Sequence, residues 1–279
     1  MTKEASAHAS VLIAMLMAAG CERPTEPPAA KTPAPPPVSA PTLPVPTPKA
    51  LNRAELIAAL DRAASDHAAG AASNLGIAGR SVVLRLPFGC GGPEPADAAP
   101  ADGLARWTWT PDRSAIRLSV TSADWTRSPL VLSPGAEPAW DRVDGFWIAR
   151  PWLSAEACPA IAPTAEATAE PGERPGAAPM TAGVAVILST EGSRLGRRDA
   201  RGGYSFLIRG ADNKPPETSL QGYRLVLEGR VGAFADGQPV RCTAGGPDVR
   251  PVCVAAVQLD VVAFEDAKGG RLSEWRPQG

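Results

Sequence analysis

The sequence predicts a mainly β fold with antiparallel, sandwich-like sheets, one N-terminal helix, and a disordered Pro-rich tether ahead of them. Three observations predict it. Apolar residues recur at helical spacing over 51–69. From residue 81 onward, apolar and polar residues alternate in short segments, as they do in half-buried strands. Residues 24–49 are dense in Pro and Ala with almost no large apolar residue, so they cannot form a core.

The helix is expected in LNRAELIAALDRAASDHAA, residues 51–69. Asn52 can cap its first turn, with Glu55 three residues on, and Gly70 can end it. His67 lies at the edge of the apolar stripe, and a lone helical histidine is typical of packing or of the surface. The residues that form the stripe are Leu56, Ile57, Leu60, Ala63 and Ala64.

Strands are expected on both sides of the middle of the chain. In SVVLRLPF, Val82, Leu84, Leu86 and Phe88 share one face. The remaining expected strands are RWTWT, SAIRLSVTS and DGFWIARPW before residue 158, and GVAVILST, YSFLIRG, GYRLVLEGRVGAFA, GQPVRC, VCVAAVQLDVVAFE and RLSEW after residue 182. The dipeptides Asp236-Gly237 and Gly269-Gly270 indicate hairpin turns.

A second stretch rich in Ala, Pro and Glu, residues 159–181, divides the domain into segments 50–158 and 182–279. Long structureless loops are uncommon inside compact domains. The stretch is therefore either a linker between two β lobes, the first carrying the helix, or an excursion from a single sandwich. Two lobes that share an interface are slightly favoured.

The first 20 residues have the pattern of an export signal. Lys3 supplies positive charge, VLIAMLMAA forms a short apolar core, and Ala18, Ala19 and Gly20 precede Cys21. A run this short cannot cross about 30 Å of hydrocarbon as a helix. The segment resembles the bacterial lipoprotein signal, which ends in small residues before a cysteine. It differs in having Ala18 where leucine is usual, and an ordinary signal-peptidase site would be cut at the same bond.

The lipoprotein resemblance implies that Cys21 carries diacylglycerol and becomes the first residue of the mature chain. The protein would then bind the membrane through this lipid. Residues 21–49 would be a lipidated cysteine followed by an extended spacer, with a reach on the order of 80 Å at about 3.1 Å per residue. Glu22 stands where inner-membrane retention usually requires aspartate, which implies the outer membrane, facing the periplasm.

Cysteine counting fits the same compartment. Of five cysteines, four remain once Cys21 is set aside, an even number suited to oxidising surroundings. We favour the pairs Cys90–Cys158 and Cys242–Cys253 among the three pairings that four cysteines allow. Loop closure by these bridges would stabilise the fold by roughly 4 and roughly 3 kcal/mol. No C-x-x-C occurs and His67 is the one histidine outside the export signal, so no metal site or cofactor is predicted.

The chain shows no motif of a known catalytic class: no P-loop, no G-x-S-x-G, no H-E-x-x-H and no dinucleotide fingerprint. A formal charge of −1 gives no attraction to nucleic acid. Carboxylates that a hydrolase could use carry no diagnostic spacing; they are Asp97, Asp102, Asp124, Asp141 and Asp144.

Two features keep ligand binding open. Tryptophans crowd into one region, and Trp107 and Trp109 lie on one face of a strand, where an indole could stack on a sugar or fill the core. Four arginines gather in SRLGRRDAR, where they could bind an anion or lie in a charged hairpin loop; they are Arg194, Arg197, Arg198 and Arg201. The sequence thus predicts a lipid-anchored envelope protein, a binding or structural module whose partner is a cell-wall or envelope component. The alternative is an envelope hydrolase that uses carboxylates.

Overall fold

One helix and eleven strands make up the part of the chain that the structure describes. The computed structural model describes residues 49–95, 101–159, 180–188, 203–211, 214–218 and 221–276, all within a unit that begins at Thr47. The elements are α1 (Arg53–Ala68), β1 (Ser81–Phe88), β2 (Ala105–Trp109), β3 (Ala115–Thr121), β4 (Ala123–Asp124), β5 (Arg142–Trp147), β6 (Ala182–Leu188), β7 (Gly203–Arg209), β8 (Tyr223–Val231), β9 (Val240–Thr243), β10 (Val252–Asp266) and β11 (Arg271–Trp275).

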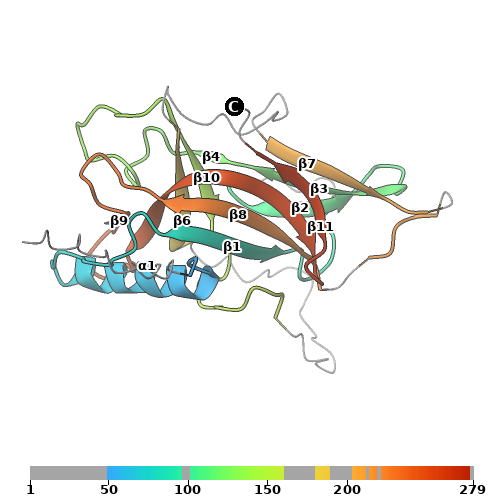
Figure 1. Cartoon of the computed structure of the whole chain (residues 1–279), viewed down its shortest axis with the longest axis horizontal. Helices are drawn as coiled ribbons and strands as arrows, with labels where there is room; N and C mark the ends of the chain where they lie inside the picture. The colour runs from blue at the N-terminus through green and yellow to red at the C-terminus, as the bar shows by residue number, and fades with distance from the viewer. Residues whose placement is uncertain are drawn as a thin grey trace, which may run out of the picture. The chain divides into compact units, whose positions relative to one another are not determined.

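The helix α1 begins and ends close to where the sequence predicts. The Asn52 side chain accepts a hydrogen bond from the Glu55 backbone N–H at 2.9 Å, and the Asn52 N–H donates to the Glu55 carboxylate at 2.9 Å. This capping box is the predicted one. The buried side of α1 packs against β1, β9 and β10 (Figure 1). His67 lies in its last turn and is exposed.

The larger sheet has eight strands, in the order β1-β8-β10-β6-β5-β4, with β9 and β11 also paired to β10. The strand β10 is central. Its first half lies between β6 and β9, and its second half lies between β8 and β11 (Figure 1). Apolar side chains of β10 point to both sides and are buried on both, as expected for a central strand.

The smaller sheet has three strands in the order β2-β3-β7. Side chains from it, including Trp107, Leu118 and Tyr204, belong to the same core as α1 and as Phe88 and Phe264 of the larger sheet. We call the face of the larger sheet that meets this core the inner face. The molecule is therefore a mainly β fold in which the larger sheet is covered on one side by α1 and by the smaller sheet, and the predicted fold class is confirmed.

The strands of segments 50–158 and 182–279 share both sheets and are not divided between two lobes. The larger sheet contains β1, β4 and β5 from the first segment and β6 and β8–β11 from the second, and the smaller sheet adds β7 to β2 and β3. Residues 47–279 accordingly form one unit. Most of the 159–181 stretch lies outside the described residues, and the strands on its two sides pair with each other directly, β5 with β6.

One of the two predicted hairpins is present. β10 and β11 pair through a turn in which Gly269 has φ of 90° and the Asp266 carboxylate accepts from the Lys268 and Gly270 backbone N–H groups. The turn at Asp236-Gly237 is formed but makes no hairpin. β8 and β9 follow one another along the same edge of β10 instead of pairing.

The opposite, outer face of the larger sheet is covered by the segment 123–141. Its Trp125, Val131 and Trp140 form a second buried cluster with Val254 and Ala256 of β10. In the part of the chain that is described, no helix is long and apolar enough to cross a membrane.

Candidate functional site

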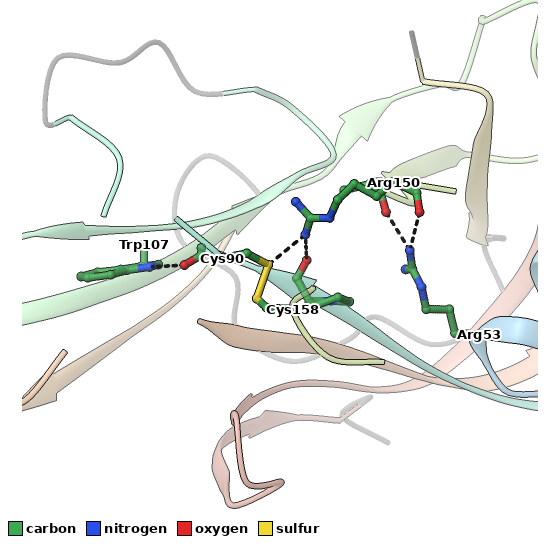
Figure 2. The surroundings of a disulfide bond; sticks show 8 residues. Arg53, Cys90, Trp107, Arg150 and Cys158 are labelled. Atoms are coloured by element: carbon green, nitrogen blue, oxygen red, sulfur yellow. Dashed lines mark hydrogen bonds between the residues drawn. A yellow bond between two sulfur atoms is a disulfide. The ribbon is translucent and has the colours of Figure 1, made fainter. Parts of the chain in front are cut away.

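The four cysteines of the domain form the two predicted disulfides. Cys242 and Cys253 are directly opposite one another on β9 and β10, and a loop of the intervening residues connects them. Cys90 follows β1 and is joined to Cys158, 68 positions along the chain. This second bridge ties the end of β1 to the loop 148–159 that follows β5, and Figure 2 shows its surroundings.

A buried tryptophan packs beside Cys90. The Trp107 indole N–H donates to the Gly89 carbonyl oxygen at 3.4 Å (Figure 2). The Trp107 ring contacts Tyr223 edge-on at 5.9 Å between centroids. Gly89 has φ of 67°, and a Cβ at this position would overlap the Trp107 ring. Only glycine therefore allows the indole to pack so close to the chain.

Of the two roles that the sequence left open for Trp107, stacking on a ligand or filling the core, the structure shows the second. Its exposed fraction is 0 %, since the smaller sheet packs it inside the core. Trp109 is half-buried against the same core, at 6.2 Å from the Trp107 ring. The exposed tryptophan is instead Trp152, 71 % exposed on the loop after β5.

Arg150 links that loop to the disulfide. Its guanidinium donates to the Pro87 carbonyl oxygen at 2.9 Å and to Cys90 Sγ at 3.1 Å (Figure 2). Burial lowers the pKa of Arg150. Its backbone has φ of 52°, in the left-handed region that non-glycine residues seldom adopt. The surrounding contacts therefore hold Arg150 in a costly conformation, a feature that is common at functional sites.

Arg53 holds the same loop from the other side. Its guanidinium is fully buried and donates to the Leu153 carbonyl oxygen at 2.9 Å. It also donates to the carbonyl oxygens of Ala149 at 2.7 Å and Arg150 at 3.0 Å (Figure 2). Burial, and then the charge of Arg150, lower the pKa of Arg53 to about 10, and Glu156 opposes this shift. Arg53 therefore stays charged at neutral pH, with its charge spread over three carbonyl dipoles.

The sequence contained no sign of these two arginines. Arg53 begins a helix and Arg150 precedes a proline, positions at which a charged residue is ordinarily solvated. Together with the disulfide they attach the loop 148–159 to α1 and to the end of β1. The loop attached in this way carries the exposed Trp152.

A separate, open hollow of about 660 Å³ lies beside the segment that covers the outer face. Both charge signs and two hydroxyl groups line it: Asp124, Thr126, Arg127, Ser128, Asp141 and Arg142. Two of the predicted carboxylates, Asp124 and Asp141, thus come together here. Such a wall suits a polar ligand that carries several hydrogen-bonding groups.

Asp124 is held ionised in this wall. Its Oδ1 accepts from the Thr126 hydroxyl at 2.6 Å and from the Thr126 backbone N–H at 3.0 Å. These bonds to Thr126, and to a smaller extent the charge of Arg142, lower the pKa of Asp124. A general acid at neutral pH needs a raised pKa, so Asp124 is suited to accept hydrogen bonds from a ligand.

The other predicted carboxylates are dispersed. Asp144 is buried, and its Oδ1 accepts from the Ser122 hydroxyl at 3.0 Å and from Arg142 Nε at 2.7 Å. Asp102 is exposed in the turn before β2. Asp97 lies outside the described residues, as do Cys21 and the four arginines Arg194, Arg197, Arg198 and Arg201. Among the described residues, no three Asp, Glu, His or Cys side chains gather as a metal site.

Comparisons with known proteins found no matching family model, no matching curated protein and no matching solved structure. The function is therefore argued from the residues and the geometry described above.

Proposed function

We propose that this chain is a lipid-anchored protein of the bacterial cell envelope that works as a binding module. Cys21 carries the lipid, residues 21–49 are the spacer, and the domain faces the periplasm from the outer membrane. Its ligand is a polar component of the envelope, such as a cell-wall glycan, which binds in the hollow beside Asp124 and Arg127.

The pairing of the cysteines is the observation that carries this proposal. Four of the five cysteines are used in the two disulfides, and the fifth is Cys21. Structural disulfides persist in oxidising compartments outside the cytosol. Lipid anchoring requires an exported chain with a cysteine directly after a short apolar run and small residues. Cys21, the cysteine left outside the disulfides, has this position.

The walls of the hollow support binding of a polar ligand. Thr126 and Ser128 bring hydroxyl groups, Asp124 brings acceptor oxygens, and Arg127 and Arg142 bring guanidinium donors. Arg127 is exposed, and among the described residues no hydrogen bond or ion pair engages its guanidinium. It is therefore available to a carboxylate or a hydroxyl of the ligand.

Fractionation of cells tests the anchor. With Cys21→Ser, we expect the protein to leave the membrane fraction and to appear in the soluble envelope fraction, because no acyl chain can be attached. The matched control is Cys21 intact with Thr25→Ser in the spacer. Retention of the Cys21→Ser protein in membranes would contradict the proposal.

Binding of soluble cell-wall glycan fragments to the detergent-solubilised full chain tests the ligand. Arg127→Ala is expected to weaken binding by about tenfold, the size of one lost charged hydrogen bond. Arg62→Ala, an exposed arginine on α1, is the control and should leave binding unchanged. Equal affinity of the two variants would exclude the hollow as the site.

The hydrolase alternative rests on one observation, that Asp124 and Asp141 line the same hollow. Incubation with the same glycan fragments separates the two functions. Release of shorter fragments by the wild type, abolished by Asp141→Asn, would identify a hydrolase. Binding without release of products supports the module.

A further inference from the structure

We propose that Cys90–Cys158 is an exchangeable disulfide, a redox modification site at which an envelope dithiol attacks Cys158 while Cys90 leaves as a thiolate beside Arg150. The inference goes beyond the proposed binding function and depends only on the presence of the oxidised bridge in the folded domain.

The contact between Arg150 and Cys90 carries the inference. Arg150 places a guanidinium N–H 3.1 Å from Cys90 Sγ (Figure 2). A disulfide sulfur is a weak acceptor, whereas a thiolate is a full anion, so the same contact is much stronger after the bridge opens. Nearby cations lower thiol pKa values for this reason. Arg150 thus stabilises the reduced form more than the oxidised form.

The position of Arg150 also sets the direction of attack. In thiol–disulfide exchange, the sulfur whose thiol has the lower pKa leaves faster. Cys90 is that sulfur, so the incoming thiolate bonds to Cys158. Both cysteines are half-buried, and the residues on either side of Cys158, Ala157 and Pro159, are exposed.

The reaction is balanced by the dithiol alone. Its thiolate forms a bond to Cys158 Sγ while the Sγ–Sγ bond breaks, and the electron pair stays on Cys90. The second thiol of the reductant loses its proton and attacks the reductant sulfur that is bonded to Cys158 in the mixed disulfide. Cys158 is released as a thiolate and is protonated, and the reductant leaves as a disulfide. Two electrons pass from the reductant to the protein.

The loop remains attached after reduction. The three bonds from Arg53 to the carbonyl oxygens of 149, 150 and 153 do not involve sulfur, and neither does the bond from Arg150 to Pro87. Only the end of the loop near Cys158 is freed. The two sulfurs therefore stay within reach of each other, and oxidation can restore the bridge.

The other disulfide lacks this arrangement. Cys253 is 1 % exposed between β9 and β6. Arg241, next in sequence to Cys242, directs its guanidinium to the Val131 carbonyl oxygen at 2.9 Å and to the Ser133 hydroxyl. Within the described ranges no cationic group contacts either sulfur of this bridge. Cys242 is half-buried, so this bridge is an internal reference for a disulfide that has no cation at its sulfurs.

Other charges around Cys90 belong to the same loop and its support. Arg53 adds positive charge behind Arg150. Glu156 carries the opposite charge but faces Arg85, at 3.6 Å from its Nη1. Arg150 is the charged group in contact with Cys90, so its removal is the direct test.

The experiment follows reduction of the purified full chain by dithiothreitol, with quenching by an alkylating agent and peptide mass spectrometry of both bridges. We expect Cys90–Cys158 to open at least about tenfold faster than Cys242–Cys253. Arg150→Met should slow that opening by about tenfold while the reference bridge is unchanged. Arg62→Met is the matched control. Equal rates for the two bridges, or an unchanged rate in folded Arg150→Met, would overturn the proposal.

A measurement on the wild type keeps the test independent of any variant. Glutathione is added to the oxidised protein, and an alkylating agent then blocks the free thiol and so traps the mixed disulfide. The adduct is expected on Cys158, with Cys90 alkylated, and an adduct mainly on Cys90 would overturn the direction proposed here. At equilibrium with glutathione, loss of Arg150 should lower the equilibrium constant for reduction of Cys90–Cys158 about tenfold. This corresponds to a reduction potential that is lower by about 30 mV for two electrons.

Discussion

The two faces of the larger sheet are both buried at β10, yet they are stabilised differently. On the inner face, Phe264 packs against Phe88 at 5.8 Å and against Trp275 at 5.6 Å between ring centroids, within the core shared with α1. On the outer face at the same end of β10, Ala263 and Val226 form a small apolar cluster. A group of charged side chains accompanies that cluster.

The charged group centres on Glu265. It is 3 % exposed, and its carboxylate accepts from Arg85 at 3.1 Å and from Arg271 at 3.2 Å. Arg271 also pairs with Glu228 and, at 2.7 Å, with Glu274. The aliphatic stems of such arginines can cover apolar neighbours while the charged ends stay near water. The difference teaches that burial of a strand on both sides does not require two hydrophobic layers.

At the other end of β10 the outer face is packed by an indole. Trp125 lies over Gly145 and Gly183 of neighbouring strands, close enough that a Cβ on Gly145 would overlap the ring. The outer face therefore has one region of close packing, one of ion pairs, and the polar hollow near Asp124.

The largest effect is expected on the inner face. Phe264→Ala should lower the free energy of unfolding by about 4 kcal/mol, because it removes a buried ring and leaves a cavity. Urea unfolding measures this. Arg117→Ala, at an exposed position on β3, is the control and should change stability little. A loss below about 1 kcal/mol for Phe264→Ala would mean that the inner face is not the main core.

The next largest effect is expected for Gly145→Ala, which should lower the free energy of unfolding by about 3 kcal/mol because the added methyl group must displace Trp125. Trp fluorescence would change along with the urea midpoint. Gly135→Ala gives a useful comparison, since open space surrounds that position and the cost there arises from its φ of 77°. If the two variants were equally stable, the packing of Trp125 on the outer face would be in doubt.

Glu265→Gln should lower the free energy of unfolding by about 2 kcal/mol, because it removes the negative charge that pairs with both Arg85 and Arg271. The arginines are about one third exposed, 33 % and 32 %, and so can turn to water, which limits the loss. High salt should narrow the difference between wild type and variant. For Phe264→Ala, salt should leave the difference unchanged, and a matching salt response would contradict the contrast between the faces.

Asp124→Asn should have the smallest effect. It should lower the free energy of unfolding by less than about 0.5 kcal/mol at neutral pH, because the carboxylate is exposed and solvent screens its charge. The pKa of Asp124 is lowered in the folded state from an ordinary value of 3.8. Its stabilising contribution is therefore complete above pH 3.8 and is lost as the pH falls through the folded-state pKa. Unfolding curves of both proteins should converge in acid. A difference that grows on acidification would reverse this assignment.

Reading β10 from sequence alone predicts a strand that is apolar on both faces, but misses a bulge. Leu259 pairs with Gly229 and Val261 pairs with Glu228, which leaves the exposed Asp260 as the extra residue. The inward positions are consequently odd up to Leu259 and even from Val262 onward. An alternation pattern cannot reveal such a shift when both faces are apolar.

By itself the sequence determined the local features: α1 with its capping box at Asn52 and Glu55, and the positions of most of the strands. These depend on periodicity, turn chemistry and spacing between residues close along the chain. Only the tertiary structure decided that strands from both halves share two sheets, that Trp107 is buried, and that Arg53 and Arg150 hold the loop beside Cys90. Strand order and the partners of a buried cation are set by contacts between segments far apart in the sequence, and a local sequence pattern carries no information on such contacts.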